Sequence, residues 1–266
     1  GCMGKTVIQK PAAFDLGRLR KDLEQVGWVL AQPKLKGLHL RWNGERLLLA
    51  GGDECTGLPH ITQALAKHFS SFDLEGEAYW HGVEDEVVAG MARRSAGNLH
   101  PEHMMVGLVI FDLVDETRSQ VNRLDRLADI CLEIAIPPIY RIGTDKAFSE
   151  ADVYRYLSNS LARGFEGLIL RHPEGRWKTG YSAALQKIKP GGEDIYKIVQ
   201  VHLSKHNDLL ESLEVAGAEG NCFMVKASPE LDQPGLVGKF ARVRYTEFAG
   251  GKPLASAAVE IVEEAA

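Results

Sequence analysis

The stretch that decides the fold reads Ala31-Gln32-Pro33-Lys34-Leu35-Lys36-Gly37-Leu38-His39-Leu40-Arg41-Trp42. Apolar and polar residues alternate from Leu35 to Trp42, which predicts a half-buried strand. Pro33 favours an extended backbone at the residue before it, and Gly37 lets backbone or ligand come close. Lys34 is therefore a candidate nucleophile, provided that its amine loses its proton. Taken alone, the stretch more often describes a surface lysine on an edge strand, so the interpretation depends on the rest of the chain.

Composition places the chain among ordinary globular proteins and excludes a globally basic one. Its 266 residues, 45% hydrophobic and 25% charged, suit one large domain or a large and a small one. With a net charge of −5, any contact with nucleic acid must come from a local basic patch. A scatter of solvated charges is at least as favoured. Candidate members of such a patch are Arg93, Arg94, Arg118, Arg123, Arg126, Lys239, Arg242 and Arg244.

The cysteines and the apolar runs bear on the compartment. The four cysteines, Cys2, Cys55, Cys131 and Cys222, are scattered without a C-x-x-C pair or histidine spacing suited to zinc. This usage predicts reduced thiols in a cytosolic protein. No apolar run approaches the roughly 18 residues of a membrane span, and no signal peptide is expected.

Hydrophobic periodicity predicts α-helices and strands up to residue 189 and only short strands beyond it. Helices are expected over 15–26, 58–69, 84–94, 121–134 and 150–163, and strands over 28–34, 37–42, 46–50, 72–80, 104–114, 167–171 and 184–189. Pro190-Gly191-Gly192 is the best linker candidate, which predicts domains over 1–191 and 192–266. The five later strands, over 195–203, 210–215, 222–227, 241–248 and 255–262, favour a small closed barrel of the oligonucleotide-binding (OB) type. A sandwich stays open as the alternative.

Five short motifs follow one another along the chain. Each has an ordinary structural interpretation when taken alone. Together they resemble the nucleotidyltransferase signature of ATP-dependent DNA ligases, most closely the small bacteriophage-type enzymes. The K-x-D-G, L-D-G-E, F-D, E-G-L-I-x-(K/R) and K-x-K motifs of that family correspond to Lys34-Leu35-Lys36-Gly37, Leu74-Glu75-Gly76-Glu77, Phe111-Asp112, Glu166-Gly167-Leu168-Ile169-Leu170-Arg171 and Lys187-Ile188-Lys189.

The resemblance implies a fold, an activity and partners. The expected fold class is α+β, with a nucleotidyltransferase (ATP-grasp-like adenylation) domain followed by a small OB-fold barrel. The expected activity is the sealing of nicks in duplex DNA through a lysyl-AMP intermediate and an adenylated DNA 5′-phosphate. ATP and Mg²⁺ (or Mn²⁺) are the implied cofactors and nicked double-stranded DNA the partner, with no membrane contact and a monomeric state.

The resemblance also assigns roles to residues. Lys34 is the expected catalytic nucleophile. Nucleotide binding is expected from Gln32 and Phe111 at the adenine, from Glu77 at a ribose hydroxyl, and from Arg171, Lys187 and Lys189 near the phosphates. Glu166 and Glu77 are the expected metal ligands, since carboxylate oxygens suit Mg²⁺. As cations, Lys187 and Lys189 would also favour the neutral amine that Lys34 needs.

The sequence departs from the family pattern beside the nucleophile. Lys36 stands where the family has aspartate, and His39 stands at a position that is usually arginine. On one continuous strand, Lys36 would share a face with Lys34, favour its neutral form and repel a metal ion. Arg41, two residues beyond His39, is the expected substitute at the ribose. An R-x-D-K signature is absent from the tail. Alternatives are an RNA ligase or capping-type enzyme of the same superfamily, or a degenerate nick-binding module.

Overall fold

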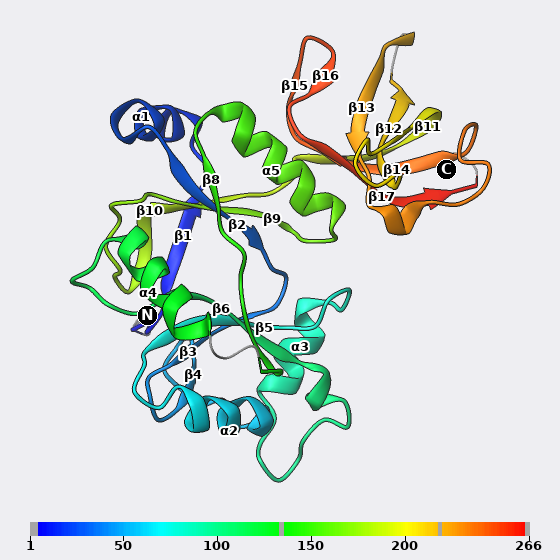
Figure 1. Ribbon diagram of the computed structural model, residues 1–266. Helices are drawn as coiled ribbons and strands as arrows, with labels where there is room; N and C mark the ends of the chain where they lie inside the picture. The colour runs from blue at the N-terminus through cyan, green and yellow to red at the C-terminus, as the bar shows by residue number, and fades with distance from the viewer. Residues whose placement is uncertain (1–4, 133–135, 218–219, 264–266) are drawn as a thin grey trace. The chain divides into compact units, whose positions relative to one another are not determined.

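The computed structural model describes residues 5–132, 136–217 and 220–263 and divides into two compact units. Unit 1 comprises Gly1–Lys146 and Ile169–Lys187, and unit 2 comprises Ala147–Leu168 and Ile188–Ala266 (Figure 1). Residues 147–168 and 188–191, which we expected in the first domain, thus group with the barrel that follows. The domain division at residue 191 stays a prediction. No helix in the described part of the chain is long and apolar enough to cross a bilayer.

Unit 1 is built on two five-stranded sheets. The first has the strand order β1-β10-β9-β2-β8. The second has the order β4-β3-β5-β6-β7. Their bounds are β1 Gln9–Ala13, β2 Val29–Lys34, β8 Asp145–Ala147, β9 Gly167–Arg171 and β10 Gly180–Ile188 for the first sheet, and β3 Leu38–Trp42, β4 Leu47–Leu49, β5 Leu74–Tyr79, β6 Gly107–Leu113 and β7 Ile139–Arg141 for the second.

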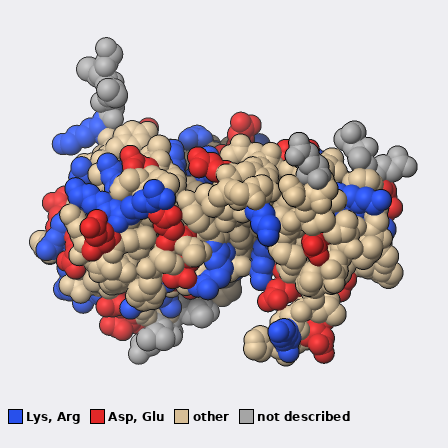
Figure 2. Space-filling model, turned by 90° about the horizontal axis from the view of Figure 1, so that it is seen from above, with Lys and Arg blue, Asp and Glu red and all other residues tan. Residues whose placement is uncertain are grey.

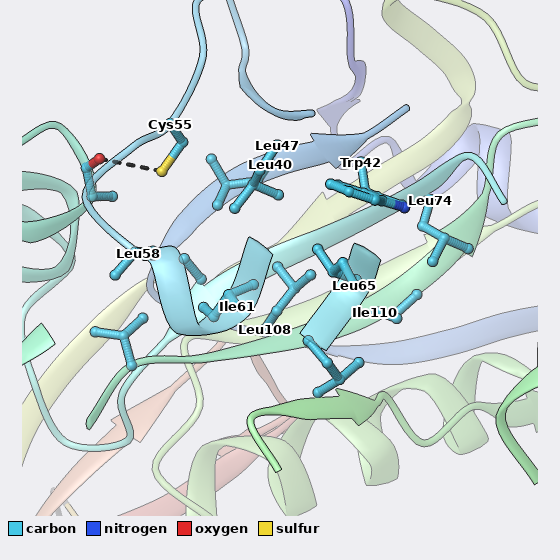
Figure 3. Packing of buried hydrophobic residues seen from close by; sticks show 14 of the residues in the cluster. Leu40, Trp42, Leu47, Cys55, Leu58, Ile61, Leu65, Leu74, Leu108 and Ile110 are labelled. Carbon is cyan, nitrogen blue, oxygen red and sulfur yellow. Dashed lines mark hydrogen bonds between the residues drawn. The ribbon is translucent and has the colours of Figure 1, made fainter. Parts of the chain in front are cut away.

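The second sheet has one apolar and one polar face. In the antiparallel register of β3 and β5, Leu40 faces Gly76 and Trp42 faces Leu74, and these side chains lie on the apolar face. The helices α2 (Pro59–His68) and α3 (Asp85–Ala92) supply apolar side chains to the same buried core. Figure 3 shows Ile61 and Leu65 of α2 beside Leu108 and Ile110 of β6. The opposite face carries the intervening polar residues of β3 and β5, and the functional site lies on it.

The expected helices form where their capping signals lie. Helix α1 (Leu16–Val26) begins after Asp15, whose side chain accepts a hydrogen bond from the Arg18 amide, and it ends at Gly27 with φ 90°. Helix α4 (Gln120–Leu132) follows the pattern expected over 121–134, whose end lies outside the described residues. The strand expected from residue 104 begins only at Gly107. The backbone before it forms a 3₁₀ turn, η1 (His103–Met105), in which the Val106 amide bonds to the His103 carbonyl.

The continuous strand expected from Leu35 to Trp42 is wrong at its first three residues. Strand β2 ends at Lys34 and β3 begins at Leu38, with a bend between them. The cause is the close approach of Gly37 to β5, because a Cβ atom at this residue would lie 2.1 Å from the Ala78 carbonyl oxygen. Lys36 therefore does not share a strand face with Lys34.

Unit 2 contains a closed five-stranded barrel in the order β11-β12-β13-β17-β14. A closed ring excludes the sandwich and confirms the OB-type expectation. Helix α5 (Glu150–Ala162), begun by a Ser149 cap, packs against β17 and β13. A separate hairpin, β15 (Phe248–Ala249) with β16 (Lys252–Pro253), interrupts the strand expected over 241–248. The barrel strands are β11 Gly192–Leu203, β12 Leu210–Ala216, β13 Cys222–Lys226, β14 Phe240–Tyr245 and β17 Ser256–Val262.

Candidate functional site

A pocket of about 170 Å³ opens between the two sheets of unit 1. Its lining combines apolar residues with a lysine, a histidine, an arginine and a glutamate. Five of the residues predicted for the site lie here together, although they come from four strands. The lining residues are Gln9, Pro11, Gln32, Pro33, Lys34, Leu35, His39, Glu77, Phe111, Ile142, Ile169, Arg171 and Leu185.

Lys34 lies at the last position of β2, where the strand ends in the bend that Gly37 permits. Pro33 beside it also lines the pocket. Lys34 therefore reaches the pocket from the end of a strand that the sheet holds in place.

Phe111 lines the pocket because of an irregularity in β6. In the pairing of β5 with β6, Glu75 faces Asp112 and Gly76 faces Ile110, so that Phe111 is an extra residue without a partner on β5. Such a bulge turns neighbouring side chains toward the same side of a strand. Phe111 and Asp112 accordingly both contact Arg171: its guanidinium lies 5.3 Å from the Phe111 ring centre, and its NH1 lies 3.3 Å from Asp112 Oδ2.

A buried polar network lies directly beneath the pocket. Asp112 accepts hydrogen bonds from two arginines, Arg171 and Arg123, and from Gln120, and all four side chains are at most 3% exposed. Burial lowers the pKa of Arg171 from its ordinary value, while the charge of Asp112 opposes that effect. Burying these charges is costly unless every group is paired, and here the pairing is extensive.

Gln32 connects this network to the pocket wall. Its Oε1 accepts from Arg171 Nε at 2.8 Å, and its Nε2 donates to the Phe111 carbonyl and to Thr144 Oγ1, both at 3.1 Å. The amide is 1% exposed and fixed at both ends.

His39 and Glu75 form a second polar pair at the site. His39 Nε2 lies 3.0 Å from Glu75 Oε2, and the His39 ring meets Phe111 edge to face at 4.9 Å. Glu75 also accepts from the Gln9 amide and from Trp177 Nε1. Burial alone would raise the pKa of the Glu75 carboxyl, but the charge of His39 and these hydrogen bonds hold it below its usual range. The site therefore keeps a charged carboxylate buried away from water.

Glu77 lies directly opposite His39 in the β3–β5 register and lines the pocket. Its Oε1 accepts from the Gly37 amide at 3.2 Å. This bond holds the backbone three residues after Lys34 against β5, which explains why a glycine is needed there.

The structure places the other predicted residues elsewhere. Arg41 makes a two-point ion pair with Asp73, donates to the Val7 carbonyl and stacks on Trp177, and it is not part of the pocket lining. Lys187 lies in β10 opposite Ala13 of β1 and also falls outside the lining. Glu166 and Lys189 belong to unit 2, where Lys189 Nζ lies 2.8 Å from Glu166 Oε1.

Lys36, the residue that replaces the family aspartate, has a partner that the sequence did not indicate. Its ammonium pairs at 2.5 Å with Glu84, at the N-terminus of α3. The expectation that Lys36 acts on Lys34 as a bare cation on the same strand face is therefore wrong, because a bend separates the two positions and a carboxylate offsets the charge.

Sequence reasoning also missed Glu75 and the buried partners of Asp112. In the sequence Glu75 stands out only as part of a motif, and no pattern points to Gln120. Arg123, proposed for a surface patch, is fully buried. The sequence signal for a buried role was an arginine in the first turn of an amphipathic helix, and its partner Asp112 lies 11 residues before it.

The other members of the expected basic patch are mostly neutralised. Arg118 pairs with Asp115, Lys239 with Glu263, Arg242 with Glu260 and Glu193, and Arg244 with Glu193. Figure 2 shows basic and acidic side chains interspersed over the face in view. Within the described residues, no three His, Cys, Asp or Glu side chains are grouped to hold a metal ion, and Cys55, Cys131 and Cys222 are free thiols.

Two viral DNA ligases are similar to this chain in sequence. No family model matches the sequence. A DNA ligase of African swine fever virus (isolate Warthog/Namibia/Wart80/1980) is 24% identical over 237 residues, which covers 77% of this chain and 55% of the viral protein. The chain thus spans about half the length of the curated relatives it matches. The same share holds for a second isolate, Tick/South Africa/Pretoriuskop Pr4/1996.

Solved structures resemble the whole chain. The Chlorella virus DNA ligase-adenylate is 18% identical with a TM-score of 0.78, covering 97% of this chain and 99% of that one. The ATP-dependent DNA ligase of bacteriophage T7, in complex with ATP, is 16% identical with a TM-score of 0.62, covering 97% and 99%. The fold is therefore the α+β adenylation fold with an OB-type barrel, as the motifs predicted.

Proposed function

We propose that this chain, a member of the ATP-dependent DNA ligase family by its sequence and its fold, seals nicks in duplex DNA through an adenylated lysine. The observation that carries the proposal is the pocket in unit 1. It gathers Lys34, Gln32, Glu77, Phe111 and Arg171, the motif residues of four separate segments, around a space that is apolar on its walls and polar at its base.

The first step is self-adenylation. The neutral amine of Lys34 attacks the α-phosphorus of ATP, a P–N bond forms, the bond to the β-phosphate oxygen breaks, and pyrophosphate leaves while the amine proton passes to solvent. Phosphoryl transfer needs mainly positioning and charge neutralisation. Phe111 offers a ring face to the base. Lys187 and Lys189 are proposed to neutralise the phosphates.

The ribose contact that we predicted for Arg41 is better assigned to His39. Arg41 has its guanidinium engaged by Asp73 and Val7, whereas His39 lines the pocket opposite Glu77. We therefore propose that His39 and Glu77 hold the ribose from neighbouring strands.

Mg²⁺ or Mn²⁺ is the implied metal, with Glu166 and Glu77 as protein ligands. Such ions commonly use one or two carboxylates and complete their coordination with substrate phosphates and water. When bound, the ion would neutralise the charge of pyrophosphate. Lys189 pairs with Glu166 in the structure and could hold this carboxylate in place.

The later steps act on DNA. AMP passes from Lys34 to the 5′-phosphate of a nick, and the 3′-hydroxyl then displaces it. Repair, replication or recombination would each supply such nicks, and a monomer in the cytoplasm of a bacterium or a phage-infected host suits this role. The free thiols support that compartment. The barrel in unit 2 is proposed to contribute to the grip on duplex DNA.

Mass spectrometry after incubation with ATP and Mg²⁺ tests the proposal. Wild-type protein should gain the mass of one AMP on the peptide that contains Lys34, and Lys34→Ala should gain none while keeping its thermal midpoint. Lys5→Ala is the matched control, since this lysine is exposed and distant in sequence from the motif. An adduct on Lys36 in wild-type protein would refute the assignment.

Further assays with this protein distinguish a DNA ligase from the alternative functions. Pre-adenylated enzyme mixed with a nicked DNA duplex should give sealed product in a single turnover. Sealing of nicked RNA alone would indicate an RNA ligase, a GMP adduct from GTP a capping-type enzyme, and DNA binding without any adduct a degenerate module.

A further inference from the structure

Strand β1 contributes to the pocket a glutamine that belongs to none of the motifs. Gln9 and Pro11 line the pocket, whereas Lys10 between them does not, and its ammonium lies 5.8 Å from the centre of the Tyr181 ring. Because successive side chains of a strand point to opposite faces, Gln9 leaves β1 on the pocket side. The residue is 1% exposed, so it forms part of the pocket wall and not of the outer surface.

The amide oxygen of Gln9 is buried and has no hydrogen-bond partner among the described residues. The amide nitrogen, Nε2, donates to the Arg176 carbonyl at 3.4 Å. A carbonyl can only accept, so the nitrogen must face it and the oxygen cannot take its place. Gln32 differs in that its amide is hydrogen-bonded at both ends. A buried acceptor without a partner is unfavourable, which makes Gln9 Oε1 a place for a donor from a ligand.

Gln9 lies beside the two residues that we propose for the ribose. Its backbone amide donates to Glu75 Oε1 at 2.9 Å, and the other oxygen of this carboxylate lies 3.0 Å from His39 Nε2. His39 in turn lies opposite Glu77 in the β3–β5 register, and both line the pocket. A single carboxylate thus connects Gln9 to His39 and places Gln9 at this end of the pocket.

The chemistry of a nucleotide limits which of its groups can meet this oxygen. Phosphate oxygens only accept, so a further acceptor gains nothing from them. The groups that donate are the two hydroxyls of the ribose and the amino group of the adenine. Because Gln9 is connected through Glu75 to His39, a ribose hydroxyl is the donor that the geometry favours.

We propose that Gln9 is a further nucleotide-binding residue, whose amide oxygen accepts a hydrogen bond from a ribose hydroxyl and thereby favours nucleotides that carry this hydroxyl. The inference rests on the proposed function, because it takes the pocket to be the nucleotide site. Gln9 has no contact with the reacting atoms, so the AMP adduct on Lys34 should still form in its absence when ATP is saturating.

Isothermal titration calorimetry with AMP, 2′-deoxy-AMP and 3′-deoxy-AMP tests the inference. These ligands have no pyrophosphate to lose, so binding is measured without catalysis. Wild-type protein should bind AMP more tightly than at least one of the two deoxynucleotides. Gln9→Met keeps the approximate length of the side chain and removes the acceptor, so this preference should shrink about fivefold, which corresponds to one neutral hydrogen bond. The loss should appear in the affinity for AMP and not in that for the deoxynucleotide.

Gln186→Met is the matched control. Gln186 is another buried glutamine, at 3% exposure, and it lies on β10 opposite Ala12 of β1. Its Oε1 already accepts from the Asp15 amide at 2.8 Å, and it is not part of the pocket lining. This variant should keep the wild-type preference, although it removes a hydrogen bond that the folded protein makes. If Gln9→Met does not fold, as judged by circular dichroism, Gln9→Leu replaces it.

The outcomes distinguish a failure of this inference from a failure of the proposed function. A preference that is absent from wild-type protein, that is unchanged in the Gln9 variant, or that falls equally in Gln186→Met overturns the inference. An AMP adduct on Lys34 alongside any of these results leaves the proposed function standing. A preference that depends on Gln9, in a protein that forms no adduct with ATP, supports the inference and refutes the ligase chemistry. Wild-type protein that binds none of the three nucleotides overturns both.

Discussion

The two units differ in where they place charged side chains. The four charged side chains that are buried in the described part of the chain, Glu75, Asp112, Arg123 and Arg171, all lie in unit 1. The core of the barrel in unit 2 consists of apolar residues such as Leu213 and Phe223. Its ion pairs lie at the surface, where Arg242 is 37% and Glu193 is 38% exposed.

The two units therefore differ in the interior that each one buries, polar beside the pocket of unit 1 and apolar in the barrel of unit 2. Removing a charge from water costs several kcal/mol, and a well-packed apolar core is often as stable as a buried ion pair. Unit 1 accepts that cost next to its pocket, where fixed polar groups orient Gln32 and Phe111. The barrel reaches its stability without it, through burial of apolar area.

The largest expected effect is that of Asp112→Ala. This change leaves Arg123 and Arg171 buried without their shared carboxylate, and breaking one side of a buried pair typically costs about 3–5 kcal/mol. The free energy of unfolding, measured by urea denaturation, should fall by this amount. The matched control is Asp115→Ala, three residues along the chain, whose side chain is 27% exposed and pairs with Arg118. It should cost less than about 1 kcal/mol. Equal losses in the two variants would show that the buried network does not carry stability.

Part of the pocket lining could be predicted from the sequence because each motif is a short, local pattern. Lys34, Gln32, Glu77, Phe111 and Arg171 meet at one pocket, as their order along the chain implied. Alternation and capping residues also located most helices and strands within a few residues. Short strands escaped detection, since β7 and β8 have three residues each and β1 contains Pro11. A run of three residues carries no periodicity.

What the sequence could not supply is pairing between distant segments. The His39–Glu75 contact depends on the register of β3 against β5, and Lys36 meets Glu84 across 48 residues. The bulge that places Phe111 and Asp112 on one side is likewise a property of the strand pair. A bend at residues 35–37 also follows from the approach of Ala78 to Gly37, which alternation cannot reveal.

Glu75→Gln should have an intermediate effect that depends on pH. The change keeps the shape of the side chain and removes the charge that His39, Gln9 and Trp177 stabilise, so we expect a loss of about 2 kcal/mol at pH 7. The folded-state pKa of Glu75 lies below its unfolded value of about 4.3. The contribution of the Glu75 charge to the free energy of unfolding is therefore fully present above the unfolded pKa. It is lost as the pH falls through the folded pKa. Urea denaturation of both proteins between pH 7 and pH 3 should show their stabilities converging. A gap that widens on acidification would contradict this sign.

The smallest effect is expected at the barrel surface, from Glu193→Ala. Glu193 lies directly opposite Arg244 in the register of β11 and β14, with 2.9 Å between its carboxylate and Arg244 Nε. The hydrogen bond from Arg244 holds the pKa of Glu193 below its usual range. The stabilisation by this pair is therefore present at neutral pH and is lost as the pH falls through the folded pKa of Glu193. Both side chains are well exposed, and cross-strand pairs of this kind are worth about 0.2–1 kcal/mol.

A double-mutant cycle of Glu193→Ala with Arg244→Ala isolates this pair. The coupling energy at low salt should fall within that range and shrink in 1 M NaCl, because screening reaches exposed charges and spares buried ones. Asp112 and Arg123 provide the contrasting cycle in unit 1, whose coupling should change little with salt. A Glu193–Arg244 coupling above about 2 kcal/mol that persists in high salt would mean that charge pairs stabilise the barrel as well, and the contrast between the two units would then fail.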